Sequence, residues 1–103
     1  MTNVADSKQI NKAKKNQKFI RDSQLDDLRK VLSTPHGRRF VWRCLGQFGV
    51  GQQPYTEKDN SKTQFNCGKL NAGLFLQAEI VEADQEAYFT MMREAANQEK
   101  VNE

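Results

Sequence analysis

The chain has 103 residues, of which 37% are hydrophobic and 28% charged, and this is enough for one domain with a modest core. It has no apolar run long enough to span a bilayer and no apolar signal-peptide core behind its lysine-rich start, so we expect a protein made and used first in a cytosol. The net charge of +3 is unevenly spread: residues 1–43 carry eleven Lys/Arg against four Asp/Glu, and residues 79–103 carry two against seven. This asymmetry predicts an anionic partner for the basic half, head-to-tail contacts between copies, or attraction between the two ends of one fold.

The first 20 residues are predicted to form a basic N-terminal arm. The segment has few apolar side chains and five lysines: Lys8, Lys12, Lys14, Lys15 and Lys18. It cannot bury enough apolar surface to hold itself in place, although its composition permits a helix. We therefore expect a disordered arm, or a helix that orders on a partner. Lys12, Lys14, Lys15 and Lys18 are expected to bind that partner, with DNA as one candidate.

Two amphipathic helices are expected after the arm, over residues 21–32 and 35–48. The first is predicted from apolar residues that recur at steps of three and four, namely Leu25, Leu28, Val31 and Leu32. Thr34 suits an N-cap and Pro35 suits the first helical position, so the chain is expected to bend between the two helices. The buried stripe of the second helix is expected to comprise Phe40, Val41, Cys44, Leu45 and Phe48, with Trp42 at its border.

The second half of the chain is predicted to contain a loop at residues 49–61 and two further helices. Gly49 is placed to end the preceding helix, and the loop is long for a helix–helix connection. A third helix over residues 62–82 has apolar side chains on most sides, so we expect it to be buried and central. These side chains are Phe65, Cys67, Leu70, Leu74, Phe75, Leu76, Ala78, Ile80 and Val81. Asp84 is expected to cap a fourth helix that ends near Gln98.

The predicted fold class is therefore all-α. We expect a small bundle of about four helices over residues 21–98, with a long loop between helices two and three. The basic arm at residues 1–20 precedes this bundle, and a tail at residues 99–103 follows it. Strand patterns are nearly absent from the sequence.

No constellation of catalytic or metal-ligating residues is recognisable. His36 is the only histidine and follows a proline at the start of a helix, where a surface or capping role is expected. Cys44 and Cys67 are expected to be small buried hydrophobes, with a disulfide between them as the weaker alternative. Two cysteines and one histidine do not supply the roughly four ligands of a zinc site. We therefore expect no enzyme activity, no cofactor and no metal.

Arginines and aromatic residues alternate on the helix that follows Pro35. Arg39 and Arg43 are four residues apart and share a face, with Phe40 and Trp42 between them. Such a mixture suits phosphate contact and base stacking, and it is also enriched at protein interfaces. The alternative is a charged outer face that pairs with the molecule's own acidic residues at 79–94. The predicted partner-binding residues of this helix are Arg38, Arg39, Trp42 and Arg43.

Two stretches of the chain resemble a small protein family of tailed bacteriophages and prophages. They are DLRKVLSTPHGRRFVWRCLGQFGV at residues 27–50 and GKLNAGLFLQAEIVEADQEAYFTMMREA at residues 68–95. In that family an L-x-T-P-x-G-R-R element precedes a helix of aromatic residues and arginines, and the resemblance covers about residues 25–96. Members are encoded among virion genes, near those for portal, capsid and tail, and the resemblance carries over no catalytic residue. It implies shared roles at Arg38, Arg39, Trp42, Asn71 and Gly73, whereas Thr34, Pro35 and Gly37 can serve the bend alone.

The resemblance and the basic surface together lead to three functional hypotheses. The first is a non-enzymatic, virion-associated phage protein: a minor structural or adaptor component at the portal–tail region, or an internal component ejected with the genome. Its partners would be phage structural proteins of the portal, tail or internal core. Several symmetric copies of the chain would contact them. Its location would be the virion, and the host cytoplasm during assembly. The alternatives are a small nucleic-acid-binding accessory or regulatory protein and an inhibitor of a host enzyme.

Overall fold

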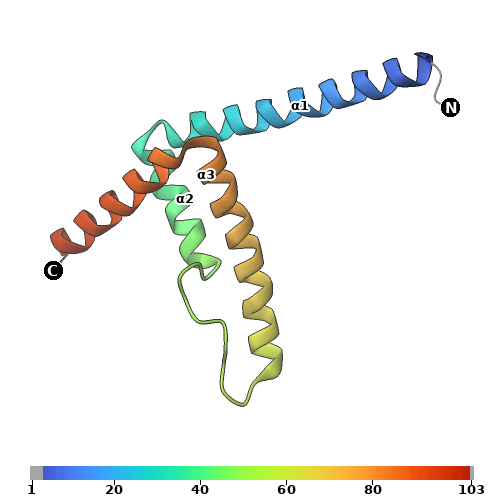
Figure 1. The fold of residues 1–103 in the computed structure, drawn as a ribbon. Helices are drawn as coiled ribbons and strands as arrows, with labels where there is room; N and C mark the ends of the chain where they lie inside the picture. Colours follow the sequence, from blue (N-terminus) through green and yellow to red (C-terminus); the bar gives the residue numbers. More distant parts are fainter. Residues whose placement is uncertain (1–3, 103) are drawn as a thin grey trace.

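The computed structural model describes residues 4–102 of the chain, and these residues form three helices (Figure 1). Helix α1 spans Val4–Leu32, α2 spans Pro35–Gln47 and α3 spans Asn60–Asn102. No strand occurs among the described residues, and the predicted all-α class is confirmed. Residues 1–3 of the predicted arm and residue 103 of the predicted tail lie outside the described residues. The rest of both segments is helical and continuous with α1 and α3.

The predicted count of about four helices is wrong, because the expected third and fourth helices are one element, α3, with a kink at Asp84. The Asp84 backbone is extended (φ −164°, ψ 92°), and its Oδ1 accepts a hydrogen bond from the Ala87 N–H at 3.2 Å. That N–H would bond the Ala83 carbonyl in an unbroken helix. Arg29 of α1 donates to this carbonyl instead, with Nε 2.6 Å from the oxygen. Asp84 therefore caps the following helical turn as predicted, but no loop separates the two halves of α3.

The predicted loop bounds of residues 49–61 are also wrong, because the loop spans residues 48–59. Helix α2 ends one residue earlier than predicted, and Gly49 adopts the left-handed conformation expected of a helix-terminating glycine (φ 81°). Helix α3 begins two residues earlier than predicted. Asp59 acts as its N-cap, since Oδ1 accepts a hydrogen bond from the Lys62 N–H at 2.8 Å.

The bend between α1 and α2 is built by neighbouring residues of the sequence. Thr34 is the N-cap of α2, and its Oγ1 accepts a hydrogen bond from the Gly37 N–H at 3.1 Å. Pro35 occupies the first turn, where a missing N–H leaves no bond unmade. Gly37 lies so close to α1 that a Cβ would stand 1.8 Å from the carbonyl oxygen of Val31. The predicted bend is confirmed, and its tightness requires glycine at position 37.

The buried core is small and lies where the three helices meet. It is a cluster of Leu32, Val41, Leu45, Ile80, Ala87 and Met91. A polar clamp next to it joins α1 to α3: Arg21 Nη1 lies 2.7 Å from a carboxylate oxygen of Glu79, and Nη2 binds Glu82. Hydrogen bonds, first to Glu79 and then to Glu82, raise the pKa of Arg21 above its ordinary value. The guanidinium of Arg21 in this clamp therefore stays positively charged.

The helices diverge from this core, so the predicted bundle is wrong. The radius of gyration is 19.3 Å and the extents are 66 × 39 × 15 Å, whereas a compact domain of this length has a radius of gyration of about 13 Å. The accessible surface is 8118 Å², and a compact monomer of 11.8 kDa exposes about 5,900 Å². The chain thus exposes roughly 2,200 Å² more than a compact monomer. Its three projecting parts are the start of α1, the α2–α3 hairpin and the end of α3 (Figure 1).

The first half of α3, residues 60–83, is not buried on most sides, contrary to the expectation for this segment. Phe65, Leu74 and Phe75 are 66%, 45% and 67% exposed. Helix α2 and the loop lie beside this half on one side only (Figure 1). The covered side includes Gly73, where a Cβ would stand 2.5 Å from the Val50 side chain, and the fully buried Ile80. The spacing of apolar residues correctly predicted an apolar helix, but only one face of this helix packs against another segment of the protein.

Two other expected core residues are exposed as well. Phe40 of α2 is 56% exposed, and Cys67 on the first half of α3 is exposed as well. Cys44 is half-buried, and both cysteines are free. Within residues 4–102, every helix falls short of the length or apolarity that crossing a membrane requires.

Candidate functional site

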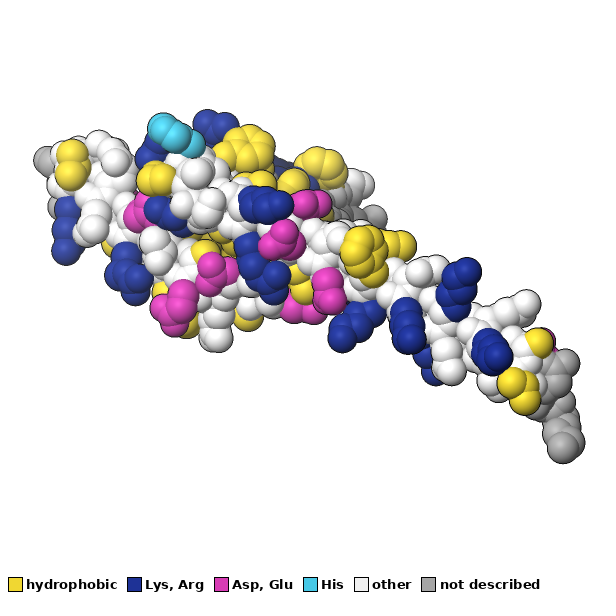
Figure 2. Space-filling view, turned by 90° about the horizontal axis from the view of Figure 1, so that it is seen from above, with side chains coloured by type: hydrophobic (Ala, Val, Ile, Leu, Met, Phe, Trp, Pro, Cys, Tyr) yellow, Lys and Arg dark blue, Asp and Glu magenta, His cyan; other side chains and the backbone are white. Residues whose placement is uncertain are grey.

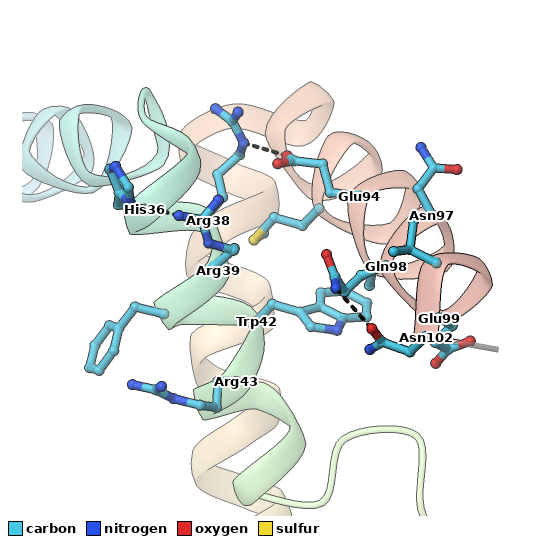
Figure 3. Close-up of a pocket in the computed structure, with 14 residues that line it drawn as sticks. His36, Arg38, Arg39, Trp42, Arg43, Glu94, Asn97, Gln98, Glu99 and Asn102 are labelled. Carbon is cyan, nitrogen blue, oxygen red and sulfur yellow. Dashed lines mark hydrogen bonds and ion pairs between the residues drawn. The ribbon is translucent and has the colours of Figure 1, made fainter.

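Helix α2 and the second half of α3, residues 85–102, border an open groove of about 870 Å³ (Figure 3). Its α2 side is lined by His36, Arg38, Arg39, Phe40, Trp42 and Arg43. Its α3 side is lined mainly by Met91, Glu94, Ala95, Asn97, Gln98, Glu99, Val101 and Asn102. The groove therefore brings the four predicted partner-binding residues of α2 next to the C-terminal end of α3. The sequence predicted no binding role for that end.

Arg38 and Trp42 form the inward-facing pair of α2, because residues four apart lie on one helical face. Arg38 Nε is 2.6 Å from a carboxylate oxygen of Glu94, and Nη1 donates to the Leu32 carbonyl at 3.0 Å. The Arg38 side chain is 17% exposed. Arg38 thus joins α1, α2 and the second half of α3. This is the alternative in which an arginine of this helix pairs with the protein's own acidic residues at 79–94.

Trp42 is half-buried and fixed by aromatic packing. Its ring centroid lies 6.4 Å from that of Tyr88, whose hydroxyl accepts a hydrogen bond from Gln77 at 2.6 Å. Figure 3 shows the indole pointing across the groove toward Gln98 and Asn102. Trp42 is therefore a rigid apolar wall beside the polar end of α3.

Arg39 and Arg43 form the outward-facing pair, and both are exposed. Arg39 Nη2 donates to Nδ1 of His36 at 2.6 Å, and the Arg43 guanidinium lies over the Phe40 ring, 5.5 Å from its centroid. Neither arginine forms a salt bridge with a carboxylate of residues 4–102. We call His36, Arg39, Phe40 and Arg43 the basic face of α2. Its positive charge is available to an outside partner.

The α3 side of the groove is polar and carries two carboxylates, those of Glu94 and Glu99. Glu94 is occupied by Arg38, and Gln98 donates from its side-chain amide to Asn102 at 3.3 Å. Amide side chains and exposed cationic side chains together suit hydrogen bonding to carboxylates or phosphates. Among residues 4–102, no group of three or more His, Cys, Asp or Glu side chains is placed to hold a metal ion.

The predicted lysines form a second basic region, separate from the groove. All five are exposed on the projecting part of α1, where Figure 2 shows lysine side chains spread along a single helix. Lys8, Lys12 and Lys15 follow each other at steps of four and three, so they share one face, and Lys14 and Lys18 flank it. Lys12 lies 20 residues, or about 30 Å of helix, from the end of α1. The fold therefore does not combine the lysines and the arginines into one surface.

Two positions of structural importance, Arg21 and Arg29, carry no local signal in the sequence. Arg21 and Arg29 bind Glu79, Glu82 and the kink carbonyl, which are more than 50 residues away in the chain. Gly73 is required by the close approach of the loop. Asn71 is different: it is exposed, and its side chain makes no hydrogen bond within residues 4–102.

Comparison with known proteins identifies a family but no individual relative. Residues 28–93 match the family described as Bbp19-like phage protein, and the match covers the end of α1, all of α2, the loop and most of α3. It includes the basic face of α2, and it excludes the polar end of α3 and five lysines of α1, namely Lys8, Lys12, Lys14, Lys15 and Lys18. Searches of curated proteins and of solved structures give no match. The resemblance to a small phage protein family is thereby confirmed, and because the match spans more than half of the chain, the protein belongs to the Bbp19-like family of phage proteins.

Proposed function

We propose that this phage protein is a non-enzymatic adaptor of the virion, a minor component at the portal–tail region or an internal component ejected with the genome. The observation that supports this most strongly is the surplus of roughly 2,200 Å² of exposed surface over a compact monomer. A standard protein–protein interface buries about 800 Å² on each partner. A chain that exposes this much surface, and whose core is confined to one junction, is suited to work within an assembly.

The basic face of α2 is the proposed docking surface. Arginine and aromatic side chains are the types most enriched at the energetic centres of interfaces. Arg39 and Arg43 carry exposed charge, and Phe40 adds an apolar side chain that is 56% exposed. The partner that fits is an acidic segment of a phage structural protein, with Trp42 and the groove receiving its apolar side chains.

Mass spectrometry of purified virions tests the proposed location. We expect the chain in assembled particles at a fixed stoichiometry of several copies. Its absence from purified particles, while it is abundant in infected cells, would overturn the proposal.

A pair of charge-reversal variants tests the docking surface. Arg39→Glu/Arg43→Glu is expected to lower incorporation into particles by about tenfold or more, because it places carboxylates against an acidic partner. The control Lys58→Glu/Lys62→Glu makes the same change in net charge around the start of α3, outside the groove. Equal incorporation of the two variants would show that the basic face of α2 does not dock.

The lysine-bearing part of α1 supports a second candidate function, DNA contact. Its lysines are exposed on a helix that projects from the body, and such a row can follow a phosphate backbone. We expect DNA binding whose logarithmic salt slope is about −2 to −4, reduced by about 2 in Lys12→Gln/Lys15→Gln. A gel-shift assay that shows no complex at low salt would exclude this function.

A further inference from the structure

The first half of α3 has a second apolar face that the protein leaves uncovered. This outer face comprises Gln64, Cys67, Gly68, Asn71, Leu74, Phe75 and Ala78, all exposed. These positions recur at steps of three and four, and so form one stripe. The stripe lies opposite the inner side that carries Asn66, Gly73 and Ile80, and Figure 1 shows no other segment beside it. Leu74 and Phe75 in this stripe are 45% and 67% exposed, although large apolar side chains that share a helix face are normally buried against a neighbour.

The outer face is also free of charge. Between Asn60 and Ala78 the charged residues are Lys62 and Lys69, and helical spacing places both on the opposite side of the helix. The next acidic side chains on the outer side are Glu79 and Glu82, and Arg21 binds both. Depletion of charge distinguishes the centre of a protein interface from ordinary surface.

No close contact within the described residues requires glycine at position 68. A Cβ at this position would meet no atom within 4 Å, and the residue lies inside a helix without positive φ. Glycine in a helix interior destabilises it by roughly 0.5–1 kcal/mol relative to alanine. Such a glycine is explained when another helix approaches closely, and no described helix of this chain does so.

The sizes of the side chains on the outer face favour a copy of the same face as the partner. Small residues, Cys67 and Gly68, lie three and four residues before Asn71. Large residues, Leu74 and Phe75, lie three and four residues after it. In an antiparallel pair of helices centred on Asn71, the small half of each copy lies against the large half of the other. A parallel pair would instead place large residues against each other and small ones across a gap.

We propose that two copies of this chain associate through the outer faces of α3, antiparallel, about a two-fold axis beside Asn71. Such an interface uses the same patch on both subunits. The two Asn71 amides meet at the axis, where each satisfies the other by hydrogen bonding. The outer face runs from Gln64 to Ala78, about 21 Å along the helix, and its large side chains Leu74 and Phe75 are 45% and 67% exposed. This inference goes beyond the proposed adaptor function and does not depend on the location of the protein in a virion.

Sedimentation equilibrium of the purified full chain tests the dimer. We expect a mass of twice 11.8 kDa for the unaltered protein and a dissociation constant raised at least tenfold in Phe75→Glu, which buries a charge in the interface. Phe65→Glu is the matched control, since both rings lie on the first half of α3 and are almost equally exposed, 66% for Phe65 and 67% for Phe75, but Phe65 lies off the outer face. Circular dichroism checks that both variants fold. An unaltered protein that is monomeric at about 100 µM, or equal effects of the two variants, would overturn the proposal.

Disulfide trapping tests the antiparallel register. In a Cys44→Ser/Cys67→Ser background, Asn71→Cys places two thiols at the axis, and mild oxidation should yield a covalent dimer. Gln64→Cys lies on the same face, but its two copies would be 14 residues apart, about 21 Å along the axis, which is too far for a disulfide. A dimer with Gln64→Cys as readily as with Asn71→Cys would indicate a parallel pair, and trapping at neither position would exclude this face. Arg39→Glu/Arg43→Glu should remain dimeric, so loss of docking and loss of dimerisation are distinguishable.

Discussion

Arg38 and Arg39 are adjacent in the chain but have different partners. Each residue of a helix is rotated by about 100° from the one before it, so Arg38 faces Glu94 and Arg39 faces solvent. The Leu-x-Thr-Pro-x-Gly-Arg-Arg element therefore consists mostly of residues that build the corner between α1 and α2. Its last arginine is the one whose charge remains exposed.

Replacing each arginine by alanine should separate these roles. Arg38→Ala leaves Glu94 without its partner in a partly buried site, and we expect a loss of about 1–2 kcal/mol in the free energy of unfolding. Arg39→Ala is expected to change it by less than about 0.5 kcal/mol. Urea denaturation followed by circular dichroism measures both, and equal stabilities would contradict the inward placement of Arg38.

Gly37 and Gly46 provide a comparison of two glycines on the same helix. A Cβ at position 37 would stand 1.8 Å from the Val31 oxygen, whereas one at position 46 would meet nothing within 4 Å. We expect Gly37→Ala to destabilise the protein by about 2 kcal/mol or more, because backbone must shift at the bend. Gly46→Ala should raise stability by up to about 1 kcal/mol. Thermal unfolding distinguishes them, and a stable Gly37→Ala variant would show that the bend is looser than described.

At the scale of elements, α1 and α3 each divide into a packed part and a free part. In α1 the buried residues, Leu25 and Leu32, lie in the last third of a 29-residue helix. No residue of α1 from Val4 to Gln24 is buried, although Arg21 binds Glu79 and Glu82 of α3. In α3 the kink at Asp84 turns the second half toward Arg38, which creates the groove beside α2.

Hydrogen exchange of the amides should reveal the division of α1. Helices without tertiary packing open readily, so residues 5–18 are expected to exchange at least about tenfold faster than residues 25–32. Mass spectrometry of peptic fragments measures the difference. Uniform protection along α1 in the free protein would mean that another surface covers its first half.

At the scale of the whole molecule, the open shape is the feature that most supports the proposed adaptor function. The core joins the helices at one point, and the molecule presents the basic face of α2, the lysines of α1 and the outer face of α3 in separate places. An adaptor that holds several partners at once requires surfaces that do not overlap.

Small-angle X-ray scattering checks this shape on a single chain. For the monomeric Phe75→Glu variant we expect a radius of gyration near 19.3 Å, well above the about 13 Å of a compact domain of this length. A value near 13–14 Å would show that the helices collapse onto one another in solution.

The sequence by itself determined the features that depend on near neighbours in the chain. The helical class, the bend at Thr34 and Pro35 and the cap at Asp84 follow from periodicity and from hydrogen bonds that span three or four residues. The phage family is also visible in the order and spacing of two sequence blocks. These features need no knowledge of where the helices lie in space.

Only the tertiary structure decided which apolar faces are covered and which arginine is occupied. Periodicity shows that Leu74 and Phe75 lie on an apolar helix, but it does not supply the neighbour that would bury them. Likewise, the partner of Arg38 depends on the direction that α3 takes after Asp84, 46 residues later in the chain. Burial and ion pairing are contacts between distant segments, and so the open fold, the groove and the uncovered outer face of α3 emerged only when the helices were placed together.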